Sequence, residues 1–191
     1  MVEFALVLPL VLLLTFGAID FGFAFSAAAG ITSATRSGAR IGSALSKQGG
    51  QIQSIVAAVN ASIGNSVRAQ ATDIVVYAAP PGSFNPPSNC GAQGTTVGAT
   101  SLCFWDSIPV NAPDKFTVDA PAASAWDTNV NIEDACPAIG NKSTAWKLSV
   151  VVKAQYPFLT PGIFGFANNL HFKEQIVIDL EPTSSGNCSP S

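Results

Sequence analysis

Charged residues are scarce in this chain and unevenly placed. Of its 191 residues only 11% are charged, the formal net charge is -3, and no Lys or Arg precedes Arg36. Without a basic surface the chain has nothing to hold a phosphate backbone, which excludes nucleic acid as a partner. An ordinary cytosolic enzyme exposes more Lys and Glu, so we expect other subunits to cover much of this surface.

The groups that catalysis needs are equally scarce. The one histidine, His171, stands beside Phe172 at the expected start of a strand, where a structural role is favoured. The acidic residues between positions 106 and 134 lack the close alternating spacing of a calcium loop. The sequence also has no zinc-ligand spacing, phosphate-binding glycine loop or nucleophile elbow. It therefore predicts no enzyme, no metal site and no cofactor.

Cysteines are few, and no CxxC pair occurs. The chain has four, Cys90, Cys103, Cys136 and Cys188. An even number at wide spacing, downstream of an apolar segment, favours two disulfides and an oxidising compartment. Three pairings are open from the sequence. We favour Cys90 with Cys103 and Cys136 with Cys188, because the first pair closes a short glycine-rich loop.

A long apolar run opens the chain. Between Phe4 and Phe25 the only charged residue is Asp20, and a helix of this length would measure about 33 Å, close to the roughly 30 Å hydrocarbon thickness of a bilayer. Pro9 removes one backbone hydrogen bond and is expected to bend the helix locally, which a membrane or a helical bundle tolerates. A signal peptide is disfavoured because an acid, Glu3, stands where a basic leader belongs. We interpret the leader as already removed, which places Met1 at or near a processed N-terminus.

Two carboxylates in this segment need partners, because burying an unpaired charge is costly. Glu3 either lies in water at the membrane surface or, in a helical bundle, pairs with the α-amino group of the next subunit and fixes the axial register. For Asp20, the partner is either Arg36 or Arg40 of a neighbouring subunit, or interfacial water. The sequence leaves both choices open.

The helical pattern continues beyond Phe25 with small residues at every fourth position. They are Ala18, Gly22, Ser26, Gly30, Ala34, Gly38, Gly42 and Ser46. Such a row allows close approach of another helix, although a segment so rich in small residues also produces rows by chance. Gly49 and Gly50 then end the helix. We therefore divide the chain into an N-terminal helix with its extension, residues 1–48, and a head, residues 49–191.

The head is predicted to be α+β. An amphipathic helix is expected from Gln51 to about Ala69, followed by a strand over 71–79 and short strands near 101–105 and 115–118. Alternating apolar residues predict two longer strands, 146–157 and 171–180, paired antiparallel. The apolar residues of their connection must pack under the sheet or against a neighbouring subunit. They are Phe158, Leu159, Ile163, Phe164 and Phe166.

The opening stretch VEFALVLPLVLLLTFGAIDFG resembles the N-terminal signature of TadE-like proteins, pilin-like components of the bacterial tight-adherence (Flp, type IVb) pilus systems. The resemblance is strongest over residues 2–23 and is supported by the later segment VVVKAQYPFLTP. It matches the family's acid to Glu3, the following aromatic to Phe4 and the helix proline to Pro9. The acid is third in this chain, whereas it is usually fifth after the cleavage point in the family.

This resemblance implies a type IV pilin-like fold and a structural role. It also implies synthesis as a prepilin, cleavage by a prepilin peptidase, insertion in the inner membrane, and transfer by the pilus assembly machinery to the cell surface. We therefore predict a subunit that assembles with copies of itself into an extracellular filament used for adhesion. The alternative is a single-pass anchored binding or sensor domain outside the cytoplasm.

Overall fold

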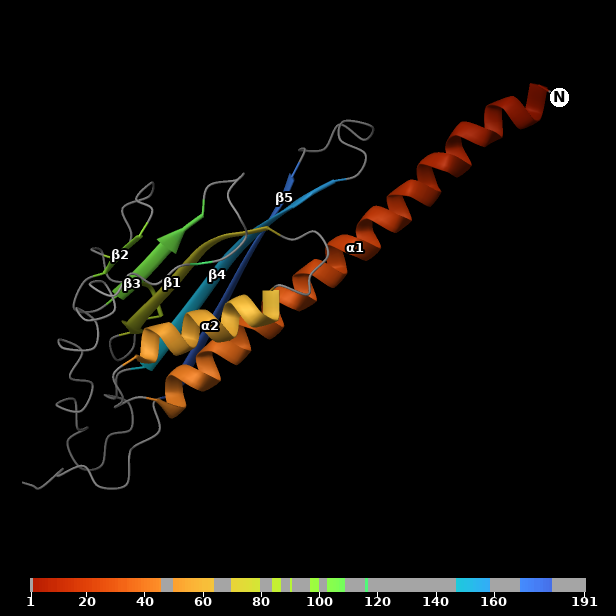
Figure 1. Ribbon diagram of the computed structural model, residues 1–191. Helices are drawn as coiled ribbons and strands as arrows, with labels where there is room; N and C mark the ends of the chain where they lie inside the picture. The colour runs from red at the N-terminus through yellow and green to blue at the C-terminus, as the bar shows by residue number, and fades with distance from the viewer. Residues whose placement is uncertain are drawn as a thin grey trace, which may run out of the picture.

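The computed structural model describes residues 2–45, 50–63, 70–79, 84–86, 90, 97–99, 103–108, 116, 147–158 and 169–179. These contain the helices α1 (Val2–Ala44) and α2 (Gln51–Ile63) and the strands β1 (Gln70–Ala79), β2 (Val97–Ala99), β3 (Cys103–Ser107), β4 (Lys147–Pro157) and β5 (Asn169–Asp179). Figure 1 shows α1 running alongside the sheet and extending well beyond it at its N-terminal end. The predicted α+β arrangement, with a long apolar helix before a second helix and an antiparallel sheet, is confirmed.

α1 is one continuous helix that runs through Pro9 without interruption. It ends at Ala44, four residues before the boundary expected from the sequence, and residues 46–49 lie outside the described part. Gly50 has a φ of 90°, a conformation that glycine adopts without steric cost, and its carbonyl accepts the Ser54 N–H at 3.0 Å. Gln51 Nε2 donates to the Gly42 carbonyl at 2.6 Å, which satisfies a C-terminal carbonyl of α1 and fixes the start of α2 against it.

α2 packs on α1 through the apolar face that the sequence predicts. Its buried side chains include Ile52, Ile55, Val56, Val59 and Ile63. The described helix covers Gln51–Ile63, and its predicted continuation to about Ala69 falls on residues 64–69, which are outside the described part. The two helices together form the layer that covers one face of the sheet (Figure 1).

The sheet is antiparallel, with the strand order β2-β3-β1-β4-β5. The predicted pairing of the two long strands is confirmed over their full length, from Lys147 opposite Asp179 to Pro157 opposite Asn169. The even-numbered residues of β4 from Leu148 to Tyr156 are buried in the core between sheet and helices, as the alternation predicts. β2 was not predicted, because Val-Gly-Ala is too short to show an alternating pattern.

Phe116 lies in the range 115–118, where the sequence predicts a short strand. It is the one described residue of that range, and it lies outside any strand. Its side chain is buried in the main core, the apolar cluster between the sheet and the two helices. Its backbone is held by Asn60 of α2: Asn60 Nδ2 donates to the Phe116 carbonyl at 2.9 Å, and the Phe116 N–H donates to Asn60 Oδ1 at 3.1 Å. The Asn60 side chain thus forms with the Phe116 backbone the pair of hydrogen bonds that a residue of a neighbouring strand would form.

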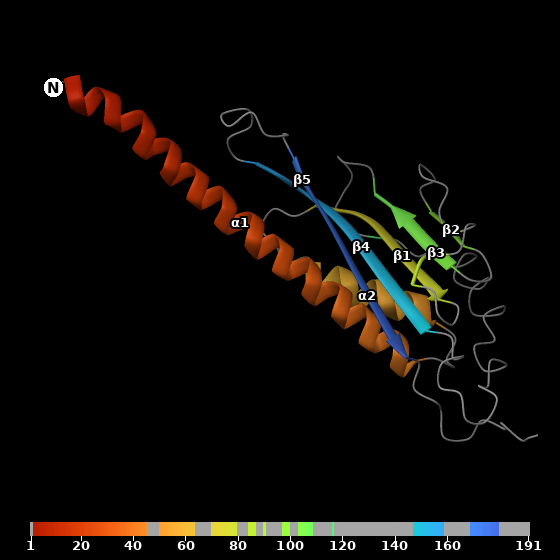
Figure 2. The same ribbon diagram turned by 180° about the vertical axis from the view of Figure 1, so that it is seen from behind.

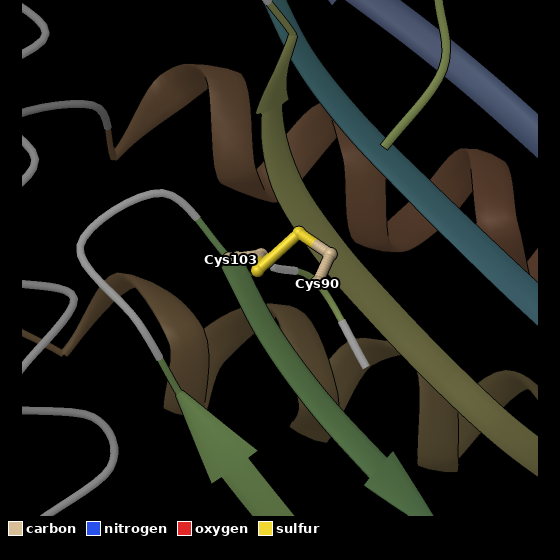
Figure 3. Close-up of a disulfide and its surroundings, with 2 residues drawn as sticks. All are labelled: Cys90 and Cys103. Atoms are coloured by element: carbon tan, nitrogen blue, oxygen red, sulfur yellow. A yellow bond between two sulfur atoms is a disulfide. The ribbon is translucent and has the colours of Figure 1, made fainter. Parts of the chain in front are cut away.

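A second, smaller apolar cluster lies on the opposite face of the sheet. Tyr77, Ala79, Cys103 and Val151 form it, with Val75, Cys90 and Trp105 packed against them. β1 therefore has buried side chains on both faces, which explains why its sequence IVVYAA is almost continuously apolar. The Cys90–Cys103 disulfide belongs to this second cluster (Figure 3).

Candidate functional site

The N-terminal part of α1 is an apolar helix that the rest of the chain leaves uncovered. Large hydrophobic side chains are exposed on every side of the helix up to Phe16. They are Phe4, Leu6, Val7, Leu8, Leu10, Val11, Leu12, Leu13, Leu14 and Phe16. Within the described part of the chain α1 is the one helix long and apolar enough to cross a membrane, judged by length and composition. An apolar surface of this size indicates contact with lipid or with other protein.

Burial begins at Gly17 and follows one face of the helix. Gly17, Asp20, Ala24, Ala27 and Ile31 are buried, a spacing of three or four residues that brings all five to the same side. From Ala24 onward these side chains belong to the core that α1 shares with α2, β4 and β5, and Figures 1 and 2 show α1 running beside these strands. The opposite side of the same turns remains exposed and aromatic, with Phe21 65% and Phe25 79% exposed. From Gly17 onward, α1 therefore faces the head on one side and its surroundings on the other.

Asp20 lies on the head-facing side. It is 3% exposed and has an interaction partner within the chain. The sequence predicts Arg36 or Arg40 of a neighbouring subunit, or interfacial water, as the partner of Asp20. Burial by the same chain is not predicted, because helical periodicity shows which residues share a face but not what covers that face.

Arg36 and Arg40 are both exposed and lie one turn apart on α1. They follow Asp20 by 16 and 20 residues on the same helix, which separates them from it by about 24 and 30 Å along the axis. The structure therefore does not bring either arginine to Asp20 of the same chain.

The other residues predicted for assembly lie near the start of α1. Phe4 and Pro9 are exposed. Glu3 is in the first turn, and its side chain lies outside the described part. Of the apolar connection between β4 and β5 only Phe158 is described. Its ring packs edge-on against Tyr156, with ring centroids 5.9 Å apart, and contacts the main core, whereas Leu159, Ile163, Phe164 and Phe166 lie outside the described residues.

The row of small residues changes environment along α1. Ala18, Gly22 and Ser26 are exposed, whereas Ala34, Gly38 and Gly42 are buried, and Ser46 lies outside the described part. A Cβ atom at Gly38 or Gly42 would collide with α2 side chains, but one at Gly22 would meet nothing within 4 Å. The second half of the row therefore packs against other parts of the same chain, whereas the first half is exposed on the surface of α1.

The Cys90–Cys103 disulfide and a network of hydrogen bonds lie on the outer face of the sheet, the face opposite the helices. Cys90 and Cys103 are bonded, the pairing favoured from the sequence, and Figure 3 shows the bond lying over β1 and β3. Cys136 and Cys188 lie outside the described part. Tyr77 Oη donates to the Phe84 carbonyl at 2.5 Å, and Gln175 Nε2 donates to Tyr77 Oη and to the same carbonyl, each at 2.7 Å. Burial raises the pKa of the Tyr77 phenol, and its hydrogen bond with Ser149 lowers that pKa in part.

A smaller polar cluster crosses three strands on this face. Asp73 of β1 accepts a hydrogen bond from Ser107 Oγ at 2.5 Å and forms an ion pair with Lys153 Nζ at 3.5 Å. Lys153 lies opposite Lys173 of β5, so Asp73 offsets the repulsion between two like charges. His171 is exposed on β5. No group of three or more metal-ligating side chains occurs among the described residues.

The comparisons with known proteins bear on α1. Residues 1–40 match the family model described as TadE-like protein. No curated protein and no solved structure matches the chain. The matched segment coincides with the uncovered apolar part of α1 and with its buried continuation toward the head. The resemblance to the TadE-like proteins, which are associated with tight-adherence pilus systems, is thereby confirmed over residues 1–40.

Proposed function

We propose that this chain is a structural subunit of an extracellular filament of the tight-adherence type, and that it assembles with copies of itself through α1. The observation that carries the proposal is the uncovered apolar surface of α1 from Phe4 to Phe16, which continues into a buried part of the same helix that shares the core of the head. A surface of this kind cannot remain in water. Lipid covers it before assembly, and equivalent helices of other subunits cover it afterwards.

The helix also suits close packing with its own copies. Gly22 has open space around it, and Ala18 and Ser26, one turn to either side, are exposed as well. Small side chains at this spacing allow two helix backbones to approach each other. In a filament this part of α1 would contact a neighbouring α1, while Gly38 and Gly42 remain occupied by α2 of the same chain.

The remaining parts of the proposal rest on the TadE-like resemblance. They are insertion in the inner membrane, handling by a prepilin peptidase and the pilus assembly machinery, location at the cell surface, and use of the filament in adhesion. The apolar residues of the β4–β5 connection are proposed as a further contact between subunits. The role is structural and not catalytic.

Electron microscopy of material sheared from the surface of producing cells tests this function. Antibodies raised against the head, residues 49–191, should label filaments along their length, and a strain that lacks the gene should show no labelled filaments. Recovery of the chain in the membrane fraction alone, with unlabelled filaments, would overturn the proposal. That result would favour the alternative, an anchored binding or sensor domain.

A further inference from the structure

Two exposed arginines lie on the side of α1 that faces away from the head. Arg36 and Arg40 are one helical turn apart, and exposed Ala29 and Ser33 connect them to Gly22 along the same side of the helix. Within the described part of the chain neither arginine side chain forms an ion pair or a hydrogen bond. Gly22 belongs to the surface proposed for contact with another α1, so a second copy seated there would continue past both guanidinium groups.

Glu174 is a partly buried carboxylate on the edge strand of the sheet. β5 is the last strand in the sheet order and lies beside α1 (Figures 1 and 2). Glu174 is opposite Val152, a residue of the main core, and on the same face of β5 it is flanked by the partly buried Phe172 and Ile176. A carboxylate in such an apolar row is costly to cover unless a cation pairs with it.

The other acidic side chains that the structure describes have partners inside the chain. Asp73 forms its ion pair with Lys153, and Asp20 and Asp106 each have an interaction partner. Glu174 forms neither an ion pair nor a side-chain hydrogen bond with the described residues. The described part thus leaves this carboxylate and the two arginines of α1 without partners of opposite charge.

Glu174 and the arginines lie at similar levels along α1. A Cβ atom at Gly42 would touch Leu148, which is opposite Ile178 in the sheet, so these three residues are at about one level. Glu174 precedes Ile178 by about 13 Å of strand, which equals about nine residues of helix. It therefore lies at the level of about residue 33, and the two arginines lie about 5 and 10 Å further along α1.

From these observations we propose that Arg36 and Arg40 of one copy pair with Glu174 of an adjacent copy in the filament. A guanidinium group suits this position because it can donate two N–H groups to one carboxylate. Two copies with parallel α1 helices need an axial stagger of about 5–10 Å to bring these groups to one level. Repetition of a staggered contact produces a helical array and not a closed ring. The inference rests on the proposed function and adds to it a contact and a stagger between subunits.

Charge reversal in a strain that lacks the original gene tests this contact. Glu174→Arg leaves cations on both sides of the contact, and the double variant Arg36→Glu with Arg40→Glu leaves carboxylates on both sides. Either variant alone should yield at least tenfold fewer sheared filaments than the original chain, with an unchanged melting temperature of the purified chain in detergent. A lowered melting temperature would show that these charges stabilise their own chain and would overturn the inference.

Production of both variants in one cell separates a contact between copies from a contact within a chain. In a mixed filament the arginine introduced in one chain can face the glutamates introduced in the other, so the yield should recover to at least half of the original. A contact within one chain allows no such recovery, because each variant keeps like charges at both positions. The triple variant, which exchanges the charges within one chain, should also form filaments. Recovery in the triple variant without recovery in the mixture would overturn the inference.

Lys173→Glu is the matched control. Lys173 precedes Glu174 on β5 but is opposite Lys153, on the other face of the sheet. Its filament yield should stay within twofold of the original. Normal filaments from Glu174→Arg would overturn the inference and leave the proposed function intact, whereas absence of filaments from the original chain would overturn both.

Discussion

Gly38 of α1 lies directly against Val59 of α2: a Cβ atom at Gly38 would come within 2.6 Å of Val59 Cγ2. This distance is shorter than real side-chain carbons approach, so the two helices are closer here than any residue but glycine allows. One turn further along α1, a Cβ atom at Gly42 would collide with Leu148 of β4 and Ile55 of α2. The glycines thus fix how α1, α2 and the sheet fit together.

Substitution of Gly38 by Ala should therefore destabilise the head. Overpacking costs about 1–3 kcal/mol, and the better helix propensity of Ala returns about 1 kcal/mol, which leaves a net loss of up to about 2 kcal/mol. Urea unfolding of the full chain in detergent, followed by tryptophan fluorescence, measures the change in the free energy of unfolding.

Gly22→Ala is the matched control, since a Cβ atom there meets nothing within 4 Å. This variant should be as stable as the original chain or slightly more stable. Equal effects at Gly22 and Gly38 would contradict the close packing of α1 on α2. Loss of filaments in Gly22→Ala with an unchanged head would instead support contact between α1 helices of different subunits.

The extent to which this fold could be predicted differs between its elements. The alternation of apolar and polar residues in β4 predicts that Leu148, Val150 and Val152 are core residues, and all three are buried. The prediction works because every second side chain of a strand points to the same face. The row of small residues on α1 was ambiguous, because the same spacing serves packing within a chain and between chains. The burial of Asp20 depends on how α1 lies against the rest of the chain, which no local pattern encodes. Phe116 was misassigned to a strand because its backbone partner is the Asn60 side chain, 56 residues earlier.

Removal of the Cys90–Cys103 disulfide should cost about 2–4 kcal/mol. The bond spans 13 residues of sequence, and by the chain-entropy estimate a loop of about this size restricts the unfolded chain by about 3 kcal/mol. The double variant Cys90→Ala with Cys103→Ala avoids placing a hydroxyl in the buried position of Cys103. Urea unfolding of the variant and the original chain gives the difference, and an unchanged free energy of unfolding would show that the bond does not constrain the unfolded state.

Stability should fall above about pH 10 through Tyr77. Burial raises the pKa of its phenol in the folded chain above the ordinary 10.0, so between these two pKa values the unfolded chain has released the proton that the folded chain still holds. The contribution of Tyr77 is therefore complete below pH 10 and is lost as the pH rises above it. Unfolding curves at pH 8 to 11 measure this loss.

Tyr77→Phe separates this effect from the titration of lysines. The variant lacks the hydrogen bond to the Phe84 carbonyl and should be about 1 kcal/mol less stable at pH 8, but its stability should fall less between pH 10 and 11. Parallel alkaline losses in the two proteins would rule out a raised pKa at Tyr77.

Glu3 should be required for assembly and dispensable for folding of the head. If it pairs with the α-amino group of the next subunit inside a helical bundle, Glu3→Ala leaves that cation buried without a partner, at a cost of about 3–5 kcal/mol for each contact. Filaments should then disappear from the sheared fraction, while thermal unfolding of the head is unchanged. Glu3→Gln should fail in the same way because it lacks the charge, and Glu3→Asp should retain part of the assembly. Normal filaments from Glu3→Ala would refute the pairing.

A cryo-electron microscopy reconstruction of filaments sheared from producing cells tests assembly through α1 most directly. We predict that the filament is built from this chain, with the α1 segments from Phe4 to Phe16 packed against one another at the axis and the heads outside. A filament that lacks this chain, or one in which α1 does not contact its copies, would contradict assembly through α1.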